Sequence, residues 1–145
     1  MYRNILLAYD GSCDGREALR QGAKLASLCG ARIILLTVID ISGGMLPVEG
    51  MSFVNDDEER QTNLMLEEGR SRLLELGISG DVDLRYGNPA EQIALSAQEI
   101  GADLIIVGHR NQGTLSRWLN GSVGASILIQ TSCSVLIAVD SHLQR

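Results

Sequence analysis

A glycine-rich segment in the last third of the chain has the composition of a phosphate-binding loop. The unbroken apolar run Leu104–Val107 predicts a buried strand and ends directly at Gly108. A polar loop follows, and Gly121-Ser122 then begins an apolar-periodic segment that predicts a helix. Glycines let backbone N–H groups approach an anion closely, and the free N–H groups at the start of a helix attract one. The segment therefore predicts a phosphate site, although a purely structural α/β crossover with glycines shares this spacing.

A second polar turn follows the first predicted strand. Asn4–Tyr9 is a short apolar run, and Asp10-Gly11-Ser12 breaks it. If this strand is central, the winding of the sheet reverses between it and the Leu104–Val107 strand, and open parallel sheets bind ligands at such a reversal. The Asp10 turn would then face the glycine-rich segment across one crevice. Asp10 has an alternative role as the N-cap of the next helix, with Ser12 as a rival cap.

Short apolar strands alternate with helices along the chain. Strands are predicted over Asn4–Tyr9, Arg32–Val38, Asp81–Tyr86, Leu104–Val107 and Ser134–Val139, and helices over Cys13–Cys29, Asp56–Leu76, Pro89–Ile100 and from Gly121 to about Thr131. This alternation predicts an α/β fold in a single domain spanning residues 1–145, with a parallel sheet and helices on both faces. Asp81–Tyr86 alternates polar and apolar residues, which is typical of an edge strand. The glycines and proline of Ile39–Asn55 predict a surface excursion.

Local signals predict the ends and faces of the helices. Asn88 is the predicted N-cap of the third helix, with Pro89 at its first position, and Gly101 is the predicted C-terminal cap. The apolar side of the Asp56–Leu76 helix is expected to come largely from Leu64, Met65, Leu73, Leu74 and Leu76.

Composition excludes several classes of protein. The net charge is −6 without a basic tract, and aromatic residues make up 3%, so neither phosphate-backbone nor base-stacking recognition of nucleic acid is expected. No apolar run approaches the roughly 20 residues of a membrane span, and the opening residues lack a signal-peptide pattern. Cys13, Cys29 and Cys133 are odd in number and far apart, which predicts neither disulfides nor a metal site. These features predict a cytoplasmic protein.

Several segments resemble the universal stress protein family over essentially the full length of the chain. They are ILLAYDGS, LLTVID, GNPAEQI, ADLIIVG and the ending GSVGASILIQTSCSVLIAV. The nucleotide-binding branch of that family carries a glycine, two residues, a glycine, nine residues, and then glycine with serine or threonine. This chain keeps the register with Gly108, Asn111 and Gly121-Ser122, but Asn111 replaces the second glycine. The resemblance implies an adenine nucleotide alpha hydrolase-like fold with strand order 3-2-1-4-5.

The resemblance also implies a site for an adenine nucleotide. Asp10 would help to hold the adenosine part, backbone groups of Val38 would pair with the adenine edge, and Gly108 would lie at the ribose. The positions that contact phosphate are Asn111, Gly121, Ser122 and Val123, and Ala8, Arg110 and Gly113 complete the candidate set. The Asn111 side chain occupies space that phosphate oxygens could use, so ATP, ADP and AMP all remain open. Any Mg²⁺ would be held mainly by the phosphates and water.

The resulting prediction is an adenine-nucleotide-binding protein that regulates a stress response. The family commonly dimerises through the last strand, which here is Ser134–Val139. Ile41–Asn55 is the candidate mobile element. Two alternatives stay open, a dimeric interaction scaffold with an empty crevice and a slow ATP hydrolase. The glycine loop has neither a P-loop lysine motif nor an evident general base, so at most weak turnover is expected.

Overall fold

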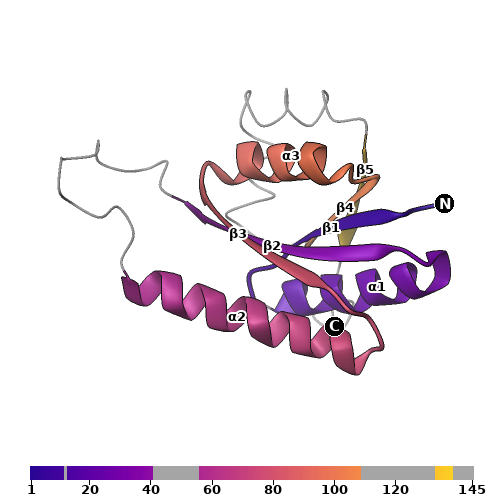
Figure 1. Cartoon of the computed structure of the whole chain (residues 1–145), viewed down its shortest axis with the longest axis horizontal. Helices are drawn as coiled ribbons and strands as arrows, with labels where there is room; N and C mark the ends of the chain where they lie inside the picture. Colours follow the sequence, from indigo (N-terminus) through magenta and orange to yellow (C-terminus); the bar gives the residue numbers. More distant parts are fainter. Residues whose placement is uncertain (12, 41–55, 109–132, 139–145) are drawn as a thin grey trace, which may run out of the picture.

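The computed structural model describes residues 1–11, 13–40, 56–108 and 133–138. In these residues strands and helices alternate along one five-stranded sheet (Figure 1). The strands are β1 (Asn4–Ala8), β2 (Arg32–Asp40), β3 (Asp81–Gly87), β4 (Leu104–Gly108) and β5 (Ser134–Ala138), and the helices are α1 (Cys13–Cys29), α2 (Asp56–Glu75) and α3 (Pro89–Ile100). The excursion was expected to begin at Ile39, but Ile39 and Asp40 belong to β2. Residues 41–55 and the helix expected from Gly121 lie outside the described residues.

The sheet is parallel, and its order is β3-β2-β1-β4-β5, which confirms the expected fold. β1 is the central strand, and its Ile5 lies opposite Ile33 of β2 and Leu104 of β4. A strand in this position is covered on both faces of the sheet, so it needs apolar side chains in both directions. Ile5, Leu6 and Leu7 accordingly have no exposed surface.

The helices form two layers, with α1 and α2 against one face of the sheet and α3 against the other (Figure 1). Side chains alternate along β1, so the two cores share the strand between them. Leu7 and Tyr9 pack under α1 and α2, whereas Leu6 and Ala8 pack under α3. Among the described helices, none combines the length and the apolar character needed to cross a membrane.

Both predicted caps of α3 are confirmed. The side chain of Asn88 accepts a hydrogen bond of 3.1 Å from the backbone N–H of Glu91, and Pro89 occupies the first turn. Gly101 ends the helix with φ of 65°, a left-handed conformation that glycine adopts without the clash of a Cβ atom. The caps fix where the chain leaves β3 and where it enters β4.

The apolar face predicted for α2 was partly wrong. Leu73 is buried and Met65 packs half-buried against the core, as predicted, but Leu64, Leu74 and Leu76 are exposed. The helix also buries Leu66 and Gly69. Gly69 faces the sheet, where a Cβ atom would come within 2.8 Å of the Tyr9 ring. The helix therefore packs closely against the sheet at Gly69, a residue that a search for apolar side chains does not identify.

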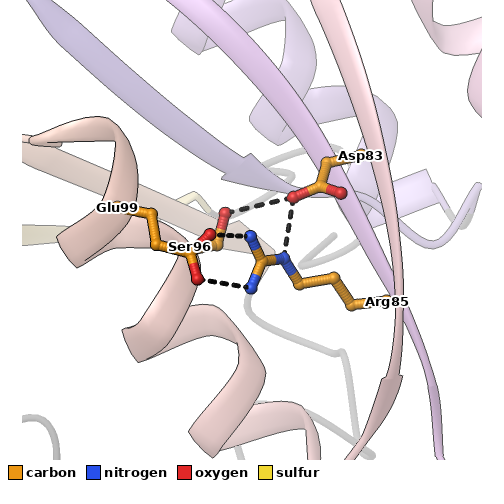
Figure 2. A network of polar contacts seen from close by, with 4 residues as sticks. All are labelled: Asp83, Arg85, Ser96 and Glu99. Carbon is orange, nitrogen blue, oxygen red and sulfur yellow. Dashed lines mark hydrogen bonds and ion pairs between the residues drawn. The ribbon is translucent and has the colours of Figure 1, made fainter.

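A polar network joins α3 to the edge strand β3 (Figure 2). The guanidinium of Arg85 bridges Asp83, at 2.8 Å from Nε to Oδ2, and Glu99 on α3. The buried hydroxyl of Ser96 lies 3.4 Å from the same Asp83 oxygen. The hydrogen bonds from Arg85 lower the pKa of the Glu99 carboxyl, and the bonds to Glu99 and Asp83 raise the pKa of Arg85. The prediction that β3 is an edge strand is confirmed. On the side of β3 that faces α3, the half-buried side chains of Asp83 and Arg85 form an ion pair.

Candidate functional site

The winding of the sheet reverses beside β1. The chain passes from β1 to β2 and then to β3 on one side, and it returns through α3 to β4 on the other side of β1. Because β1, β2 and β4 are parallel, their carboxyl ends lie at the same edge of the sheet. An open α/β sheet binds ligands at this place, since the diverging connections leave a crevice between the two central strands.

The turn after β1 brings an exposed carboxylate to this edge. Ala8 and Tyr9 are buried at the end of the strand, Asp10 is exposed, and Gly11 follows with φ of 76°. The positive φ of Gly11 lets the chain turn sharply away from the strand toward α1. Asp10 therefore stands at the carboxyl edge of the sheet, where the reversal occurs.

Val38 lies near the end of β2, which runs to Asp40, and Gly108 is the last residue of β4. Tyr9 N–H donates to the Leu36 carbonyl at 2.9 Å, and backbone groups alternate sides along a strand. The N–H and C=O of Val38 consequently point to the same side of β2 as the Leu36 carbonyl, beyond the end of β1. Gly108 is buried as the last residue of β4 and pairs with Ala138 of β5.

Four of the predicted site residues thus gather at one edge of the sheet, namely Ala8, Asp10, Val38 and Gly108. The other six lie outside the described residues, namely Arg110, Asn111, Gly113, Gly121, Ser122 and Val123. The sequence-based crevice required the Asp10 turn and the end of β4 to share one edge, and the parallel pairing of β1 with β4 confirms that requirement.

Sequence reasoning missed Thr37 and the role of Tyr9. Thr37 is a buried polar residue of β2, and its hydroxyl donates a hydrogen bond of 2.6 Å to the Tyr9 carbonyl. The only sequence signal was a single hydroxyl residue in the apolar run RIILLTV. Burial raises the pKa of Tyr9, whose hydroxyl has no hydrogen-bond partner in the described part of the chain.

An open hollow of about 370 Å³ is lined by residues of α1 and of the carboxyl-terminal end of α2. Its lining consists of Arg16, Glu17, Leu19, Arg20, Arg72, Glu75 and Leu76. Arg20 is paired with Glu17, and Arg72 lies 3.0 Å from Glu68. Because carboxylates already balance these arginines, the hollow does not favour an anionic ligand.

Comparison with known proteins agrees with the observed fold. A model of the universal stress protein family matches residues 1–138. The stress response protein NhaX of Bacillus subtilis (strain 168) is 34% identical over 158 residues, which covers 92% of this chain and 95% of that protein. A crystal structure of a family member from Burkholderia pseudomallei matches with a TM-score of 0.68 and 28% identity, over 94% of this chain and 95% of that one.

The chain also shares its fold with a structure that was solved with a nucleotide bound. The universal stress protein from Archaeoglobus fulgidus in complex with dAMP matches with a TM-score of 0.70 and 22% identity, over 94% of this chain and 98% of that one. The family match nearly spans the chain, and the relative from Bacillus subtilis is similar over almost its whole length. The chain therefore belongs to the universal stress protein family.

Proposed function

We propose that this chain binds an adenine nucleotide at the carboxyl ends of β1, β2 and β4, and that it regulates a stress response as a homodimer. The observation that carries the proposal is the exposed carboxylate of Asp10, directly after the central strand and at the reversal of the sheet. A carboxylate there can accept hydrogen bonds from ribose hydroxyls, and hydrogen bonds to charged groups are among the stronger ones. The proposal is also supported by relatives of this fold whose structures contain cAMP, dAMP or AMP.

The described residues fit the adenosine part of such a ligand. The backbone groups of Val38, directed beyond the end of β1, offer a donor and an acceptor for the adenine edge. Gly108 leaves the end of β4 without a side chain, so a ribose can approach the backbone there. Ala8 is small and buried between them.

The phosphates would be bound by the glycine-rich segment that follows β4. We assign this role to Asn111, Gly121, Ser122 and Val123, with Arg110 and Gly113 beside them. Mg²⁺ would bind through phosphate oxygens and water. We propose binding without appreciable turnover, since the sequence contains no P-loop lysine motif to support phosphoryl transfer.

Equilibrium dialysis with AMP, ADP and ATP tests the proposal. Asp10→Ala should weaken binding by about tenfold, the loss expected for hydrogen bonds to a charged group. Gly121→Val should abolish binding without unfolding the protein, because its side chain would enter the phosphate loop. Asp81→Ala is the matched control, since Asp81 is also exposed but lies at the amino end of β3. Binding of none of the three nucleotides by the wild-type protein would overturn the proposal.

A second candidate is a dimeric interaction scaffold with an empty crevice. It is favoured by the apolar side chains on the edge strand β5, where Val135 is 39% and Ile137 is 42% exposed. An edge strand with exposed apolar residues is a surface that proteins cover by pairing. A dimer that binds none of the three nucleotides would support this candidate.

A further inference from the structure

The peptide group that joins Tyr9 to Asp10 is fixed by a neighbouring strand. The Thr37 hydroxyl donates to the Tyr9 carbonyl at 2.6 Å, and this carbonyl belongs to the same peptide plane as the N–H of Asp10. The N–H of Tyr9 is bonded to the Leu36 carbonyl at 2.9 Å. Both backbone groups of Tyr9 are thus tied to β2, although β1 itself ends at Ala8.

Helix α2 holds the same turn from the other side. A Cβ atom on Gly69 would lie 2.8 Å from Cε1 and 3.1 Å from Cδ1 of Tyr9, so the Tyr9 ring rests directly on the helix backbone. A Cβ atom on Gly11 would lie 2.9 Å from the sulfur of Met65. The residues before and after Asp10 therefore both lie against α2, Tyr9 against its backbone and Gly11 against the Met65 side chain.

We propose that Thr37 and Gly69 are positioning residues for nucleotide binding, acting through Tyr9 on the carboxylate of Asp10. The inference rests on the proposed function. Thr37 sets the orientation of the peptide that leads into Asp10, and Gly69 sets the depth at which the Tyr9 ring seats. Asp10 directly follows Tyr9, so the orientation of this peptide sets the direction in which the Asp10 backbone leaves β1.

A merely structural role would have a different signature. If Thr37 only satisfied a buried carbonyl, its loss would lower the free energy of unfolding and leave the affinity of the folded protein unchanged. A positioning role instead lowers affinity, and it does so only while Asp10 is present to be positioned. The two roles are separated by combining each variant with Asp10→Ala.

The test measures AMP and ATP affinity by isothermal titration calorimetry, with urea unfolding in parallel. Thr37→Val keeps the shape of the side chain and removes its hydroxyl, and we expect about a fivefold loss of affinity, the size of one hydrogen bond. Thr37→Ser should restore most of the affinity. In the Asp10→Ala background, Thr37→Val should have no further effect. Equal losses in both backgrounds, or wild-type affinity in Thr37→Val, would overturn the inference.

Gly69→Ala tests the positioning of Asp10 through the Tyr9 ring, independently of the Thr37 hydroxyl. Its matched control is Gly22→Ala in α1, where a Cβ atom would lie 2.8 Å from Leu7 Cδ1 of β1 and 3.1 Å from Ile106 Cδ1 of β4. Both changes add one methyl group to a helix against the sheet, but only Gly69→Ala presses on Tyr9. We expect Gly69→Ala to lower affinity at least threefold more than Gly22→Ala, in line with the cost of overpacking. Equal affinities would contradict the role of Gly69.

The amide resonances of Asp10 and Gly11 separate failure of this inference from failure of the proposed function. In nucleotide-free protein, Thr37→Val should shift both resonances, whereas Ser96→Ala, which removes another buried hydroxyl on α3, should leave them in place. If wild-type protein binds no adenine nucleotide, the proposed function fails and the resonances alone decide whether Thr37 positions the turn. Unshifted resonances in Thr37→Val would then refute it.

Discussion

Asp103 and Asn4, ninety-nine residues apart in the sequence, hold each other through two reciprocal hydrogen bonds. The N–H of Asn4 donates to Asp103 Oδ1 at 3.1 Å, and the N–H of Asp103 donates to the Asn4 carbonyl at 3.0 Å. The second carboxylate oxygen accepts from the N–H of Arg3 at 2.8 Å. One side chain thus joins the amino ends of β1 and β4, the two strands whose carboxyl ends flank the proposed site.

Replacing Asp103 by Ala should destabilise the fold without weakening nucleotide binding. The change leaves two backbone N–H groups without their charged acceptor, and we expect a loss of about 1–2 kcal/mol in the free energy of unfolding because these groups are partly exposed to water. Urea unfolding measures the loss. Affinity for nucleotide should stay within twofold of wild type, since the side chain lies at the opposite end of the sheet. A tenfold loss of affinity would show that the strand ends are coupled.

Asn88→Ala should lower the stability of α3 by about 1 kcal/mol, the usual cost of losing an N-cap side chain. The cap is well defined, because the Asn88 side chain accepts from the N–H of Glu91. Asn88→Ser should recover most of the loss, since serine also caps helices well. The measurement is the urea midpoint of the three proteins, and equal midpoints for Asn88→Ala and wild type would contradict the assignment.

Glu99 should contribute to stability at neutral pH but not in acid. The hydrogen bonds from Arg85 lower its pKa in the folded protein, so its contribution is present above the unfolded pKa of about 4.3 and is lost as the pH falls through the lower folded value. The difference in urea midpoint between wild type and Glu99→Gln should be constant above about pH 5 and should shrink toward pH 3. In an Arg85→Gln background this pH dependence should disappear. A difference that does not change with pH would argue against the ion pair.

Local patterns predicted the elements well, because each carries its own signal. Continuous apolar runs marked the buried strands, and Asn88 and Gly101 marked the ends of α3. Strand β2 continues to Asp40, beyond the predicted end at Val38, because its last residues pair with Tyr86 and Gly87 of β3. Contacts between elements distant in the sequence leave no such signal.

In the candidate site, too, the contacts between distant elements could not be predicted from local sequence patterns. The position of Asp10 followed from the break after the first strand, and the parallel sheet brought Val38 and Gly108 to the same edge. The hydrogen bond from Thr37 to Tyr9 and the contact of Gly69 with Tyr9 depend on how β2 and α2 pack against β1. A threonine and a glycine inside apolar segments do not reveal such contacts locally. The ligand-binding roles themselves stay predictions.

Charge placed on β5 should dissociate the proposed homodimer. Val135 and Ile137 are exposed on this edge strand, and a second copy pairing there would bury both. Ile137→Glu would bury a carboxylate in that contact, so we expect a monomer in sedimentation velocity at concentrations where wild type is a dimer. Leu95→Glu is the matched control, because Leu95 is similarly exposed but lies on α3, away from the edge. Dissociation by Leu95→Glu alone would move the interface to α3, whereas a wild-type monomer would remove the dimer from the proposed function.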